Sequence, residues 1–173
     1  MDSHLDRAVS EFLAPIAGLS AEQMQRGPAG GWTRQQVVEH LLLSYRSTAR
    51  GLQKTLIQKH GPRGAPTLRN RVSKFVLLTC GYFPRGREAP EPVRPAASES
   101  PMSGAQLAST LRNALTEMET AIDAAEAQLG ERTRILRHHV LGPLTAREWR
   151  KFHAVHARHH VKQLARIASA EKA

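Results

Sequence analysis

The sequence has very little cysteine, few aromatic residues and no long apolar run. Cys80 is the only cysteine in 173 residues, which excludes an internal disulfide and favours a reducing, cytoplasmic location. No apolar run approaches the ~18–20 residues of a membrane-spanning helix, and Asp2, Asp6 and Glu11 interrupt the start of the chain. We therefore expect neither a membrane span nor a signal peptide. We expect Cys80 itself to be a small buried apolar group rather than a nucleophile.

Aromatic residues make up 5% of the chain, whereas Leu and Ala dominate an apolar fraction of 40%. This composition favours helices over sheets. The net charge is +10, and residues 46–94 account for +9 of it, with eleven Lys and Arg residues against Glu88 and Glu91. Such a segment can bind phosphates or gather an anionic substrate, or it can be a solvated surface. Its basic residues include Arg46, Arg50, Lys54, Arg63, Arg69, Arg71, Lys74, Arg85 and Arg87.

Four short stretches share one pattern, in which Ser or Thr follows an apolar residue and precedes Gln or Glu by three positions. They are LSAEQM (19–24), WTRQQV (32–37), MSGAQL (102–107) and LTAREW (144–149). The pattern is typical of a capping box with a hydrophobic staple, so each stretch predicts the start of a helix.

Apolar residues spaced by three and four predict helices over about 5–16, 33–59, 107–129 and 145–169, with a short helical turn after Ser20. Residues 61–102 are rich in proline and basic residues, and we interpret them as a loop-rich insertion in which 68–83 forms a short helix or a strand, with a helix favoured. We see no β-hairpin signal. The prediction is one all-α domain over 1–173, a four-helix bundle with a long connection between its second and third helices.

Four of the nine histidines fall in FHAVHARHHVKQL, residues 152–164. At about 100° per residue, His156 and His160 share the apolar face of the last helix, with His153 one turn earlier. Imidazoles at positions i and i+4 converge on one metal ion in helical sites. Buried neutral histidines with a structural role, or a solvated basic face, are the alternatives.

His40, in GGWTRQQVVEHLLLSYR, is the candidate third ligand. Its helical face also carries Gln36 and Ser44 and is rich in small residues, which suits a pocket. Gln163 follows His160 by three positions, and we expect it to bond a ligand imidazole or a metal-bound water.

The segments WTRQQVVEHL and LGPLTAREWRKFHAVHARHHVKQL together resemble the DinB-like superfamily of bacterial four-helix bundles. The closer likeness is to a branch related to the transferases that use bacillithiol or mycothiol. The resemblance covers both ends of the chain and leaves residues 61–135 largely unmatched. One departure is His139, where that branch often has proline.

The resemblance implies a divalent ion, Zn²⁺, Ni²⁺ or Fe²⁺, held by His40, His156 and His160. It also implies a small-molecule substrate, because the superfamily includes transferases of low-molecular-weight thiols, a maleylpyruvate isomerase and sulfoxide-forming iron enzymes. We expect a metal-dependent enzyme of the thiol-transferase or hydrolase type, with His153, Gln163, Gln36 and Ser44 around the ion. The alternatives are a metal-binding bundle without chemistry and a basic bundle associated with nucleic acid. A homodimer is compatible with either.

Overall fold

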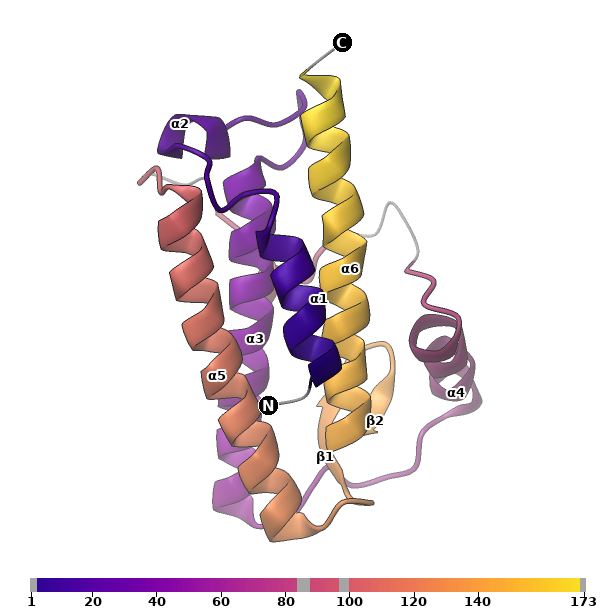
Figure 1. Ribbon diagram of the computed structural model, residues 1–173. Helices are drawn as coiled ribbons and strands as arrows, with labels where there is room; N and C mark the ends of the chain where they lie inside the picture. The colour runs from indigo at the N-terminus through magenta and orange to yellow at the C-terminus, as the bar shows by residue number, and fades with distance from the viewer. Residues whose placement is uncertain (1–2, 84–87, 97–99, 172–173) are drawn as a thin grey trace.

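The computed structural model describes residues 3–83, 88–96 and 100–171. Four helices form a bundle, α1 (Ser3–Leu13), α3 (Arg34–Gln58), α5 (Gly104–Leu129) and α6 (Ala146–Ala170), and they lie roughly along one axis (Figure 1). α2 (Ala21–Met24) is a single turn before α3. The predicted all-α bundle is confirmed. Within the described ranges, no helix is both long enough and apolar enough to cross a bilayer.

All four predicted capping boxes are present. Ser20, Thr33, Ser103 and Thr145 each accept a hydrogen bond from the backbone N–H three residues on, and the side-chain oxygen of the Gln or Glu there accepts one from the backbone N–H of the cap residue. These bonds satisfy N–H groups that have no partner within the helix, so each helix begins where the pattern places it.

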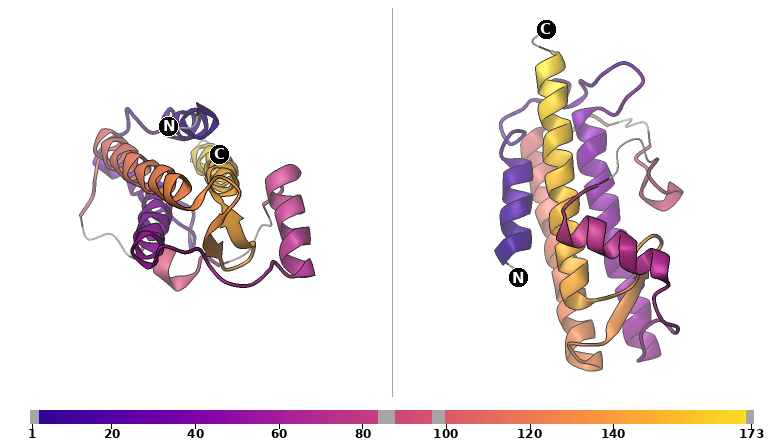
Figure 2. Two further views of the ribbon diagram at one scale, coloured as in Figure 1. Left: turned by 90° about the horizontal axis from the view of Figure 1, so that it is seen from below. Right: turned by 90° about the vertical axis from the view of Figure 1, so that its right-hand side faces the viewer.

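The long connection follows from the direction of the helices. α3 and α5 run the same way and lie side by side, while α1 packs on α6 (Figures 1 and 2). At about 1.5 Å per residue, the 25 residues of α3 span about 37 Å, so the chain must return that length before α5 can begin. The predicted insertion is this return crossing.

The crossing carries a helix, as favoured from the sequence. α4 (Leu68–Lys74) continues into the π-helical turn η1 (Phe75–Thr79), and a 3-10 turn, η2 (Glu91–Val93), follows. α4 stands apart from the bundle on the side of α6 (Figures 1 and 2). It is attached there because Lys74 Nζ binds the carboxylate of Glu148 at 2.9 Å and Asn70 Nδ2 donates to the Val140 carbonyl at 2.8 Å.

Two expectations were wrong. A β-hairpin, β1 (Arg134–His138) paired antiparallel with β2 (Gly142–Thr145), joins α5 to α6. His138 Nδ1 accepts the N–H groups of Val140 and Leu141 and so stabilises the turn, where Gly142 has a φ of 73°. Cys80 is exposed rather than buried, because it follows the last residue of η1 as the chain leaves the bundle.

The core lies between the four helices and extends under the hairpin. Fully buried Tyr45, Phe12 and Met118 contribute large side chains to it, together with Ile135 and Leu144 from the hairpin. The apolar core thereby fixes the distance between α3 and α6, the two helices that carry the histidines of interest.

Candidate metal centre

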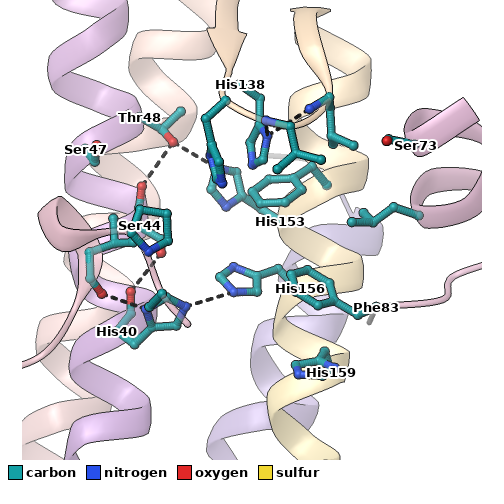
Figure 3. A pocket seen from close by; sticks show the side chains of 18 of the residues that line it. His40, Ser44, Ser47, Thr48, Ser73, Phe83, His138, His153, His156 and His159 are labelled. Atoms are coloured by element: carbon teal, nitrogen blue, oxygen red, sulfur yellow. Dashed lines mark hydrogen bonds between the residues drawn. The ribbon is translucent and has the colours of Figure 1, made fainter. Parts of the chain in front are cut away.

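His40 lies two turns into α3, and its position follows from the start of that helix. Thr33 and Gln36 form the capping box, and Arg34, almost fully buried, binds Glu171 near the end of α6 through two bonds of 2.6 Å. Trp32 precedes the cap, and its ring lies 5.1 Å from the imidazole of His40. The start of α3 is therefore joined to the end of α6, and His40 faces α6 (Figure 3).

His156 and His160 lie one turn apart on α6 and are buried, like His40, with exposed fractions of 4%, 5% and 6%. His156 Nε2 lies 3.0 Å from His40 Nε2 and 3.0 Å from His160 Nε2. The ligand atoms of the three residues all lie within 4.8 Å of one another. The structure thus brings together three histidines from two helices, with His40 and His156 116 positions apart in sequence.

The outer nitrogens of two of these rings have fixed partners. His40 Nδ1 lies 2.7 Å from the backbone carbonyl of Val93, and His160 Nδ1 lies 2.7 Å from Oε1 of Gln163. Both partners accept hydrogen bonds, so each Nδ1 donates, and in a neutral ring the Nε2 then carries a lone pair. Outer bonds of this kind orient metal-ligating histidines.

His156 is held differently. Its Nδ1 is buried without a hydrogen-bond partner among the described residues. The ring is oriented by packing, since Phe83 and Phe152 stack against it with centroids at 5.3 and 5.4 Å. Its Nε2 faces the Nε2 atoms of His40 and His160. No hydrogen bond at Nδ1 determines which of its two ring nitrogens carries the proton.

Burial favours the neutral form of all three imidazoles. Desolvation lowers the pKa of His40, lowers that of His156 well below its usual range, and lowers that of His160 to about 3, and the neighbouring histidines reinforce the effect at His156 and His160. Neutral imidazole is the form that binds metal ions.

The three residues fit a cation. Because His40 and His160 present lone pairs, a proton on His156 Nε2 can be donated to only one of them, and the other 3.0 Å contact then has no hydrogen between its two nitrogens. Nitrogens bound at 2.0–2.1 Å to one ion lie roughly 3.0–3.4 Å apart. The donor set and its spacing therefore suit a transition metal ion better than they suit three free rings.

The other predicted residues are placed as follows. Gln163 bonds His160, as described. His153 is fully buried, and its Nε2 lies 3.1 Å from Thr48 Oγ1. Ser44 donates to the backbone carbonyl of His40 at 2.8 Å. Gln36 belongs to the capping box, donates to the Ala96 carbonyl at 3.3 Å, and is not among the residues that line the cavity beside the histidines.

Most basic side chains of the 46–94 segment that the structure describes are exposed, and of them Arg69 lines the cavity beside the histidines. Arg46, Arg50 and Lys54 are exposed along α3, and Arg63, Arg69 and Arg71 are exposed near α4. Lys74 is paired with Glu148, and Arg94 with Glu88. Arg85 and Arg87 lie outside the described residues. A nucleic-acid partner stays a prediction.

A cavity of about 1350 Å³ opens beside the three histidines, between α3, α6 and α4. Figure 3 shows His40 and His156 facing one another at one end, with Thr48, His138 and His153 farther along and Ser73 across from them. Val93, Phe83 and Trp32 also surround the histidines, and the sequence did not single out Val93 or Phe83. Both lie in the crossing, whose path no periodic pattern predicts.

Comparison with known proteins agrees with the resemblance seen in the sequence. A family model of the DinB superfamily matches residues 4–164, nearly the whole chain. Neither the curated proteins nor the solved structures contain a match. The family match and the buried three-histidine group together fit metal binding, and members of this superfamily bind metal. The chain therefore belongs to the DinB superfamily.

Proposed function

We propose that the protein binds a divalent transition metal ion, Zn²⁺, Ni²⁺ or Fe²⁺, through His40, His156 and His160. We further propose that it is a metal-dependent enzyme acting on a small molecule, of the thiol-transferase or hydrolase type. One observation carries the proposal, namely that three buried imidazole nitrogens converge at one end of a large cavity. A pocket with a few convergent polar groups is the usual form of a small-molecule site.

Three neutral imidazole ligands leave a divalent ion its full charge and an open side, and such an ion, when bound, supplies Lewis acidity that favours the ionised form of a thiol or water. Residues of the chain orient the ligands and shield the site. The Val93 carbonyl and Gln163 hold the rings of His40 and His160 in one orientation. Phe83 and Trp32 lie against the histidine rings, which limits the access of bulk water from that side.

The first experiment is metal analysis of protein purified without a histidine tag. We expect about one transition metal ion per chain in the unmodified protein and none in His156→Ala. His159→Ala is the matched control, because His159 is the adjacent imidazole on α6 and is not in the three-histidine group. An unmodified protein without stoichiometric metal would contradict the proposed site.

Catalysis needs a separate measurement. Metal-loaded protein is assayed with small thiols and an electrophile, and with simple esters and amides, beside His156→Ala. We expect turnover that disappears with the metal and returns when it is restored. A protein that binds metal and turns over none of these probes would be the non-catalytic metal-binding bundle instead.

A further inference from the structure

The cavity is long rather than round. Its residues on α3 run from His40 to Gly51, eleven positions along the helix. At about 1.5 Å per residue, this wall is about 16 Å long. Its members after His40 are Ser44, Ser47, Thr48 and Gly51, whose small side chains leave room along the helix. The histidines therefore occupy one end of an extended chamber.

The other walls are predominantly apolar, although Arg69, Ser73, His138 and His153 also line them. α6 contributes Trp149 and Phe152, and α4 with η1 contributes Val72, Val76 and Leu77. The far end is closed by Leu136 of the hairpin, whose Cδ2 would lie 2.9 Å from a Cβ placed on Gly51. Apolar walls give few hydrogen-bond partners, so a polar body such as a sugar or a peptide backbone would lose its bonds to water without replacement.

We propose that this chamber binds the apolar body of an elongated small molecule, an alkyl, acyl or aryl chain, whose polar head lies at the three histidines. The position of the head rests on the proposed function, whereas binding of the apolar body does not. The chamber is long enough for such a body, and α4 covers it as a wall attached to the bundle by Lys74 and Asn70. Specificity for substrate then comes from chain length as well as from the head.

Straight-chain carboxylates from butanoate to decanoate are suitable probes, titrated into the metal-loaded protein by calorimetry. Burying each methylene favours binding about fourfold, so we expect the dissociation constant to fall by about that factor per carbon until the chamber is filled. The only two tryptophans, Trp32 and Trp149, both line the chamber, so their fluorescence should change on binding. A dissociation constant independent of chain length would overturn the proposal.

Variants on α4 locate the binding. Ser73 lines the chamber, whereas Leu68 lies on the outer face and is 77% exposed. We expect Ser73→Phe to weaken decanoate binding more than tenfold and to affect butanoate little, with Ser73→Ala and Leu68→Ser unchanged. The reverse result, loss in Leu68→Ser and none in Ser73→Phe, would place the probe on the exposed surface of α4 and contradict the proposal. If Ser73→Phe does not fold, Ser47→Phe is the substitute, because it fills the chamber from the α3 side and should have the same effect on decanoate binding.

His156→Ala separates the two proposals. We expect the variant to lose metal and to bind all the carboxylates more weakly by a common factor while keeping the dependence on chain length. Dependence on chain length in a protein that never binds metal would contradict the proposed function alone. Stoichiometric metal without that dependence would contradict the present inference alone.

Discussion

The amide oxygen of Gln163 lies 2.7 Å from Nδ1 of His160, one turn farther along α6. This bond fixes the proton on Nδ1 and leaves Nε2 free to bind an ion. We expect Gln163→Leu to weaken metal affinity about 10–100-fold, as measured by competition with a chromophoric chelator. Gln163→Glu keeps an acceptor at the same place and should bind metal at least as well as the unmodified protein. Equal losses in both variants would indicate a packing effect.

The pH dependence of stability should include a contribution from His153. Burial lowers the pKa of His153 to about 3, and the charge of His138 adds to the effect, whereas the pKa in the unfolded chain is about 6.5. Below pH 6.5 the unfolded chain binds a proton that the folded chain does not, so this contribution to stability is present above that pH and is lost as the pH falls towards 3.

The corresponding variant is His153→Gln, compared with the unmodified protein by urea unfolding at pH 8 and pH 5. The difference at pH 8 measures the change in packing alone. From one group with these pKa values we expect the unmodified protein to lose, between the two pH values, up to about 2 kcal/mol more unfolding free energy than the variant. Parallel losses would contradict the assignment of a buried neutral imidazole.

Arg34 and Glu171 join the start of α3 to the end of α6. The hydrogen bond from Arg34 lowers the pKa of Glu171, so the pair stabilises the fold above the unfolded pKa of a carboxyl group and loses this effect as the pH falls through the lowered value. We expect Glu171→Gln to have a lower Tm than the unmodified protein at pH 7 and a difference that shrinks towards pH 3. Scanning calorimetry at the two pH values measures this.

Gly104 starts α5 where the backbone of the segment between α1 and α2 passes closely. A Cβ on Gly104 would overlap the carbonyl group of Ile16. The backbone N–H of Gly104 donates to the Leu19 carbonyl at 2.9 Å. We expect Gly104→Ala to lower the free energy of unfolding by about 1–3 kcal/mol, since backbone atoms must move. Gly18→Ala is the control, because a Cβ there meets nothing within 4 Å and no such loss is expected.

Local patterns in the sequence predicted the elements that local chemistry determines. Ser20, Thr33, Ser103 and Thr145 cap their helices through residues three positions away, so short stretches suffice to place each start. His156 and His160 are one turn apart, and their common face also follows from helical geometry. The pairing of His40 with them is a tertiary contact, and it was proposed from the small-residue face of its helix and then from the likeness to a family.

The missed features are not marked by a familiar pattern of side chains in the sequence. The hairpin contains RILRH, in which a histidine ring rather than a Gly or Asn pair stabilises the turn through Nδ1. The Val93 carbonyl that orients His40 is a backbone group, and no side-chain pattern marks it. Cys80 was expected to be buried from its apolar neighbours, but Leu77 and Leu78 face the bundle and the chain turns outward after them.

His40 and His156 are separated by 116 residues of chain. An incompletely folded or truncated chain can offer only the pair on α6, because the third imidazole arrives when the two ends of the sequence have packed together. High-affinity metal binding should therefore come late in folding and be confined to natively folded chains. In that sense the ion would serve as a test of completed assembly, and the metal content of a preparation would report the fraction of chains that have reached the native state.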